Sequence, residues 1–185
     1  MRPSRIVAGT IALVAALVVP TALAPAQPAQ AFPTIVVPTC AQIWKTSGYP
    51  FSTLFPAGTV LSSDTVRTGA STPRQAEIIN GGQHVNCTWT NGKRSITVSV
   101  AIIDAFEKRE IRDWYTANGI TMFSIGGGRA EFAAVPHAGV RHEMQWTGPY
   151  FYVSIDDRSF GSLGASMQSV NSTIWNLNPW LLMTV

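Results

Sequence analysis

The chain has 185 residues, of which 46% are hydrophobic and 12% are charged, with 13 Lys and Arg against 10 Asp and Glu. This composition excludes a disordered chain, because disorder goes with low hydrophobicity and high net charge. Two cysteines and so few basic residues also exclude a zinc array of paired Cys-x-x-Cys motifs and a histone-like basic tail.

The first 31 residues have the pattern of a cleavable signal peptide. Arg2 and Arg5 precede an apolar run from Ile6 to Val19, and a Pro/Ala/Gln stretch then ends at residues 29–31. The apolar run has about 14 residues, fewer than the roughly 20 that a membrane-spanning helix needs. We therefore expect cleavage after Ala31, no transmembrane segment in the mature chain, and a secreted protein, either extracellular or associated with the cell wall.

The mature chain, residues 32–185, has the length of one domain. Cleavage removes two arginines and lowers the formal charge from +3 to +1, so no dense basic face remains and we expect no nucleic-acid partner. Cys40 and Cys87 are the only cysteines, and oxidising conditions outside the cytoplasm favour their pairing. We predict a Cys40–Cys87 disulfide.

Residues 32–84 predict an irregular N-terminal segment with short helices. Pro and Gly recur between residues 49 and 84, which indicates turns. Short helices are expected over residues 40–45 and over residues 73–80, where Thr72 is a capping residue and Pro73 takes the first helical position. A segment this irregular is either functional or held in place by the disulfide.

Residues 85–185 predict an α+β core that opens with a hairpin. Alternating runs over 85–90 and 93–102 flank Asn91-Gly92, which predicts a two-residue turn with residues 90 and 93 opposite each other. In that register Cys87 faces Ile96. One face of the hairpin is then apolar and the other is polar.

A helix and two strands are expected next. Asp104 and Glu107 have capping-box spacing and Gly119 is a helix stop, so the spacing predicts a surface helix over residues 105–118. Strands are expected over residues 120–125 and 129–135.

A second hairpin is expected over residues 139–156, with its turn at Gly148-Pro149 and Thr147 opposite Tyr150. Its apolar face collects Val140, Met144, Trp146, Phe151, Val153 and Ile155. Its polar face places Arg141 directly across from Asp156. That face comprises Arg141, Glu143, Gln145, Tyr150, Tyr152, Ser154 and Asp156.

The C-terminal helix shows the clearest periodicity, since apolar residues recur every three or four positions from 160 to 177 and Pro179 follows. Its stripe fits the apolar face that the hairpins leave open. The fold class predicted is α+β, with a single antiparallel sheet, helices packed on one face, and one disulfide.

Three short motifs stand out: Cys40, then Cys87 and Trp89, then Gly127, Gly128, Arg129, Ala130 and Phe132. They resemble those of a group of small exported actinobacterial envelope proteins, many of them lipoproteins, of unknown function. This chain lacks the lipidation cysteine of that group. The resemblance implies an antiparallel sheet flanked by helices and a role at the cell envelope, and it implies no catalytic residues.

No catalytic motif is complete. The Gly161–Gly164 run lacks the frame of a serine-hydrolase elbow, and Trp146 stands where His142-Glu143 would need a second histidine for a zinc site. We expect no metal and no cofactor.

The polar face of the second hairpin is the predicted binding patch, because tyrosine and arginine are enriched in recognition surfaces. We interpret the chain as a non-enzymatic binding or envelope-associated protein whose extracellular or cell-wall partner is unknown. The alternative is a secreted hydrolase with a site around His142, Glu143 and Asp156, so enzymatic activity stays open. The patch comprises Arg141, Glu143, Tyr150, Tyr152 and Asp156.

Overall fold

The computed structural model describes residues 34–45, 51–61, 68–92, 94–125, 130–137, 139–146, 150–157 and 163–182, all within one compact unit, Pro33–Val185. The predicted signal peptide and its cleavage site lie outside the described residues. So do the turn at Gly148-Pro149 and the glycines of the 127–132 motif.

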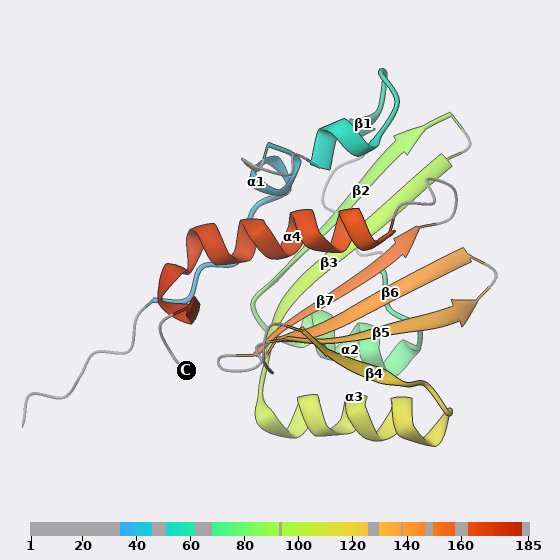
Figure 1. Cartoon of the computed structure of the whole chain (residues 1–185), viewed down its shortest axis with the longest axis vertical. Coiled ribbons are helices and arrows are strands. Elements are labelled where there is room, and N and C mark those ends of the chain that lie inside the picture. Colours follow the sequence, from blue (N-terminus) through green and yellow to red (C-terminus); the bar gives the residue numbers. More distant parts are fainter. Residues whose placement is uncertain are drawn as a thin grey trace, which may run out of the picture. The chain divides into compact units, whose positions relative to one another are not determined.

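Helices are interspersed with runs of strands along the described chain (Figure 1). In order they are α1 (Cys40–Trp44), the 3-10 helix η1 (Phe51–Leu54), β1 (Val60–Leu61), α2 (Pro73–Gly81), β2 (His84–Asn91), β3 (Arg94–Ile103), α3 (Ala105–Ala117), β4 (Met122–Ile125), β5 (Ala130–His137), β6 (Gly139–Trp146), β7 (Tyr150–Asp157), α4 (Leu163–Leu177) and the 3-10 helix η2 (Pro179–Leu182). No helix among these described residues is long and apolar enough to span a membrane.

Within the described residues, seven strands form one antiparallel sheet in the order β1-β2-β3-β7-β6-β5-β4. The strands follow the expected hairpins, and β3 then joins the two halves of the sheet by pairing with β7. The predicted α+β class with an antiparallel sheet and one disulfide is confirmed.

The first face of the sheet carries the larger hydrophobic core. α4 lies across this face (Figure 1) and packs its predicted stripe on the apolar positions of β2, β3 and β7. The buried stripe of α4 consists of Met167, Val170 and Ile174. Periodicity along the helix and alternation along the strands therefore identified this core correctly.

The second face is also covered, so the prediction of helices on one face only is wrong. A second core joins α2 and α3 to β3, β5 and β7. Its members are Ala70, Ile78, Ile79, Ala101, Ile103, Ile111, Tyr115, Ala133 and Tyr152.

Hydrogen bonds explain how a polar face can be buried. Ser99 Oγ accepts from the Gly69 amide at 3.0 Å and Ser154 Oγ donates to the Gly69 carbonyl at 2.7 Å. The hydroxyls of Thr88 and Thr97 lie 3.0 Å apart. A buried hydroxyl that has a hydrogen-bond partner avoids the cost of desolvation. Serine and threonine can therefore occupy this face of the sheet although it is buried from water.

The first hairpin turns one residue later than predicted. Asn91 pairs with Arg94, so Cys87 faces Val98 rather than Ile96, and the turn begins at Gly92 with φ +60°. The Asn91 side chain donates to the Ala57 carbonyl oxygen at 3.1 Å, which holds this residue in the strand. The partner of each residue changes by two positions, an even number, so the same side chains still share the apolar face.

The second hairpin has the predicted register, with Arg141 opposite Asp156. The helix ends also follow the predicted caps. Thr72 caps α2 in a capping box with Gln75, and Asp104 caps α3 in a capping box with Glu107. These features depend on neighbours in sequence, which explains why the sequence alone predicts them.

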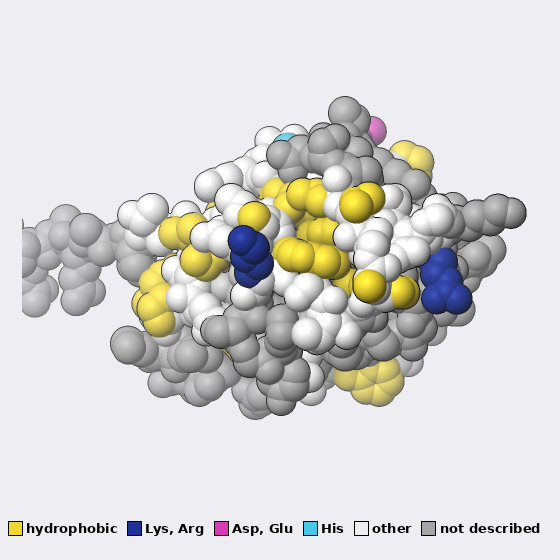
Figure 2. Space-filling view, turned by 90° about the horizontal axis from the view of Figure 1, so that it is seen from above, with side chains coloured by type: hydrophobic (Ala, Val, Ile, Leu, Met, Phe, Trp, Pro, Cys, Tyr) yellow, Lys and Arg dark blue, Asp and Glu magenta, His cyan; other side chains and the backbone are white. Residues whose placement is uncertain are grey.

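β1 forms one edge of the sheet and is only two residues long. Val60 is 60% exposed and Leu61 45% exposed. Figure 2 shows hydrophobic side chains gathered in the middle of the face seen from this end of the molecule. Such a short edge strand offers few backbone groups for pairing with another chain.

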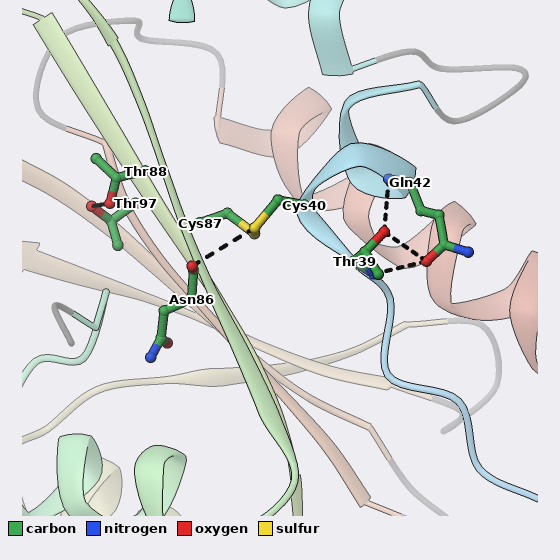
Figure 3. The surroundings of a disulfide bond; sticks show 7 residues. All are labelled: Thr39, Cys40, Gln42, Asn86, Cys87, Thr88 and Thr97. Carbon is green, nitrogen blue, oxygen red and sulfur yellow. Dashed lines mark hydrogen bonds between the residues drawn. A yellow bond between two sulfur atoms is a disulfide. The ribbon is translucent and has the colours of Figure 1, made fainter. Parts of the chain in front are cut away.

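The disulfide joins α1 to β2 as predicted (Figure 3). Cys40 Sγ also lies 3.7 Å from the Asn86 carbonyl oxygen, a packing contact because a disulfide sulfur has no hydrogen to donate. Trp44 stacks on Trp89, with ring centroids 5.7 Å apart, and on Phe55 at 5.9 Å. α1 is therefore joined to β2 by a covalent bond and by the stacking of Trp44 on Trp89.

Replacing both cysteines with alanine should lower the free energy of unfolding by about 3 to 4 kcal/mol, since the lost bond closed a loop with a sequence separation of 47. Urea unfolding of the oxidised wild type and of the Cys40→Ala/Cys87→Ala variant measures this difference. Equal midpoints would show that noncovalent contacts are sufficient to hold α1 against the sheet.

Candidate functional site

One residue of the predicted binding patch, Tyr152, lies on the second face of the sheet beneath α3. Tyr152 is 0% exposed, and its hydroxyl lies 3.3 Å from the hydroxyl of Tyr115 in α3. Ser154 is buried as well. The expectation that Tyr152 faces solvent is therefore wrong, because α3 supplies both apolar cover and a polar partner for its hydroxyl.

The other patch residues are known by strand position. Arg141 pairs with Asp156, Glu143 with Ser154, and Tyr150 with Ile103. The side chains of Arg141, Glu143, Tyr150 and Asp156 lie outside the described part of the structure. Their binding role stays a prediction.

The register separates the three residues of the alternative hydrolase site. His142 pairs with Ile155 of the apolar face, whereas Glu143 and Asp156 occupy positions of the opposite face. Successive residues of a strand point to opposite sides of the sheet. The register therefore places position 142 on the opposite face of the sheet from positions 143 and 156. Among the described residues, no group of three or more His, Cys, Asp or Glu is placed to hold a metal ion.

A polar hollow of about 480 Å³ lies along one side of α3, and we call it the α3 hollow. The spacing of its lining residues is helical, which puts them on one face over about three turns. Three of the six side chains are cationic and one is a carboxylate. The lining residues are Ala105, Lys108, Arg109, Arg112, Asp113 and Thr116.

Lys108 lies at the boundary between this hollow and the second core. Only 8% of the residue is exposed, because Lys108 falls on the same stripe as the buried Ile111 and Tyr115. Its Nζ lies 3.6 Å from Glu131 Oε2 of β5. Burial lowers the pKa of Lys108, while the negative charge of Glu131 opposes this shift.

Arg112 shares the same carboxylate, with Nη2 3.3 Å from Glu131 Oε1. Lys108 and Arg112 thus form ion pairs with the same carboxylate, that of Glu131 in the sheet. Arg109 is exposed and has no ion pair with any other described residue. The positive charge of this wall is consequently only partly compensated.

The opposite side of α3 is attached to α2. Arg74 donates from Nε to Glu110 Oε1 at 2.7 Å and from Nη2 to Glu110 Oε2 at 3.0 Å, and it also pairs with Glu77. These hydrogen bonds from Arg74 lower the pKa of Glu110. α3 is therefore held by the core on one side and by an ion pair on another, which gives the α3 hollow a defined wall.

The sequence did not predict this hollow, because the four consecutive charged residues 107–110 are typical of a solvated helix surface. One signal was present: Lys108 is three residues before Ile111 and seven before Tyr115, so it falls on the apolar stripe of the helix. A charge on such a stripe predicts a buried partner. Nothing in the local sequence identifies that partner as Glu131.

Two other hollows carry fewer charged groups. One, of about 310 Å³ between α1 and α4, has Lys45 as its single charged lining residue among those described. The other, of about 390 Å³ beside Cys40 and Leu61, is mainly apolar, and its one titratable described lining residue is His84. The α3 hollow is thus the best candidate for a site that recognises a charged ligand.

No protein-family model, curated protein or solved structure matches this chain. The resemblance to exported actinobacterial envelope proteins stays a prediction.

Tyr152→Ala should lower the free energy of unfolding by about 3 to 5 kcal/mol, as expected for truncating a fully buried aromatic side chain. Tyr152→Phe keeps the ring and should cost only about 0.5 to 1.5 kcal/mol, the contribution of one hydrogen bond. Urea unfolding measures both. A negligible cost for Tyr152→Ala would mean that α3 does not cover this position.

The lowered pKa of Lys108 predicts a pH dependence of stability. The unfolded chain holds this proton more tightly than the folded chain, so the free energy of unfolding should rise with pH between the lowered pKa and the ordinary lysine value. Lys108→Met should lack this rise. Glu131→Gln should move its onset to lower pH, since the carboxylate that favours the charged form is gone.

Urea unfolding of wild type and Lys108→Met across alkaline pH tests this dependence, and both proteins share every other titrating group. Parallel stability curves would contradict the burial of the Lys108 ammonium.

Proposed function

We propose that this protein works outside the cytoplasm as a non-enzymatic binding protein that takes an anionic group into the α3 hollow. The single observation behind the proposal is that Lys108, Arg109 and Arg112 line one polar hollow. Hydrogen bonds between cationic side chains and carboxylate or phosphate groups are stronger than those between neutral groups. A hollow with three such donors favours an anion.

Arg109 is the principal contact in this proposal. Its guanidinium has no ion pair within the described part of the chain, whereas Lys108 and Arg112 already share Glu131. An incoming anion can therefore bind Arg109 without displacing an existing pair. The planar guanidinium also offers two parallel donors to a carboxylate or phosphate.

The dimensions of the α3 hollow suit a small ligand. Its volume of about 480 Å³ falls within the roughly 300 to 1,000 Å³ of small-molecule sites. Its described lining residues include no His, Ser or Cys, and Thr116 Oγ1 donates to the Arg112 carbonyl oxygen. These features favour binding over acyl transfer. The register, which puts positions 142 and 143 on opposite faces of the sheet, weakens the hydrolase alternative.

The cellular location in this proposal follows from two features. The disulfide indicates an oxidising environment of the extracellular type. The leader-like pattern of residues 1–31 supports export. We propose that the ligand or partner belongs to the medium or the cell envelope, and that nucleic acid is not a partner because the mature charge is near neutral.

Titration of the mature protein with inorganic phosphate and with acetate, followed by amide chemical shifts at constant ionic strength, tests the proposal. Shifts should concentrate on α3. Arg109→Gln should weaken binding about 5-fold or more, because it removes a hydrogen bond between charged groups.

Arg94→Gln is the matched control, since it removes the same charge from an exposed position on β3, away from the α3 hollow. Equal loss in both variants would indicate unspecific attraction to a basic surface. Absence of any shift on α3 with either anion would overturn the proposed function.

A further inference from the structure

Donors and acceptors are segregated along the α3 hollow. Lys108, Arg109 and Arg112, which donate hydrogen bonds, line its first part. Asp113 and Thr116 line the part nearer the C-terminus of α3. The hollow therefore has a positive end and an end that accepts hydrogen bonds.

The acceptor end has capacity to bind. Asp113 is exposed and has no ion pair with any other described residue. Thr116 Oγ1 donates its hydrogen to the Arg112 carbonyl oxygen at 3.0 Å, so what it offers a ligand is lone pairs. A group bound here must bring its own hydrogens.

The two ends have a definite separation. With a rise of about 1.5 Å per residue, the centre of the three cations lies about 7 Å along the helix from the centre of Asp113 and Thr116. Both ends belong to one straight helix whose inner side is packed in the second core. A ligand that contacts both ends must span this distance.

We infer that the ligand of the α3 hollow is a small zwitterion, with its anionic group at Lys108, Arg109 and Arg112 and its ammonium group at Asp113. This inference rests on the proposed function, which requires only the anionic group. It adds the charge pattern that the ligand must carry.

Two alternatives fit this hollow less well. A second anionic group at the far end would face the Asp113 carboxylate and be repelled. A hydroxyl there would make a hydrogen bond with one charged partner, which is weaker than a hydrogen bond between two charged groups. An ammonium group is attracted by the charge of the Asp113 carboxylate and also donates to it a hydrogen bond between two charged groups.

The test uses three straight-chain probes with six carbons each: 6-aminohexanoate, hexanoate and hexylamine. Each is titrated into the mature protein at constant pH and ionic strength, with binding read from amide chemical shifts on α3. The zwitterion should bind about 3- to 5-fold more tightly than hexanoate, the effect expected of one exposed ion pair. Hexylamine should bind most weakly, because it cannot use the three cations.

Two variants test which end of the α3 hollow binds the ammonium group and which binds the carboxylate. Asp113→Asn should abolish the preference for 6-aminohexanoate over hexanoate and leave hexanoate binding intact or stronger. Arg109→Gln should weaken both carboxylates and keep their ratio. Glu77→Gln is the matched control, because it removes an exposed carboxylate from α2 outside the hollow. Circular dichroism verifies that each variant is folded.

The failures of the two proposals are distinguishable. Equal binding of hexanoate and 6-aminohexanoate, with loss of both in Arg109→Gln, would overturn the zwitterion and leave the anion site standing. A preference that survives Asp113→Asn would overturn the placement of the ammonium group. Failure of every anionic probe, inorganic phosphate included, to shift α3 would overturn both proposals.

Discussion

Burial of the two central strands on both faces is the constraint on which the rest of this fold depends. β3 and β7 pair with each other in the middle of the sheet, with one core under α4 and another under α2 and α3. One face of these strands is apolar and needs only a helix with an apolar stripe. The other face carries hydroxyls, and its cover must bring hydrogen-bond partners as well as apolar side chains.

Two parts of the chain meet that requirement. The backbone of Gly69 bonds to Ser99 and Ser154, and the hydroxyl of Tyr115 in α3 lies beside that of Tyr152. α3 is therefore positioned by polar as well as apolar contacts. Its location in turn determines where Lys108 lies, since this residue shares the inward stripe of the helix.

The α3 hollow follows from that placement. Glu131 stands in the same cross-strand row as Tyr152, with the position of residue 145 between them, and its carboxylate lies near two cations of α3. Three cations of α3 against the carboxylates of Glu131 and Asp113 leave net positive charge on this side of the helix. This remaining positive charge is what the proposed anion site depends on, because a site whose charges were all paired would not attract an anion.

The sequence by itself determined those features that depend on residues close together along the chain. Capping boxes, the stripe of the C-terminal helix, the register of the second hairpin and the apolar face of each hairpin all follow from spacing within about 20 residues. The disulfide could also be predicted, because two cysteines have one possible pairing within the chain.

Tertiary structure alone decided what covers the polar face. The contact between Ser154 and Gly69 spans 85 residues, and that between Tyr115 and Tyr152 spans 37. Periodicity tells which residues share a face but does not tell whether a distant segment supplies their hydrogen-bond partners. For this reason the sequence predicts Tyr152 as an exposed binding residue, whereas the structure shows it buried. The sequence likewise predicts Lys108 and Arg112 as solvated, whereas the structure places Glu131 beside them.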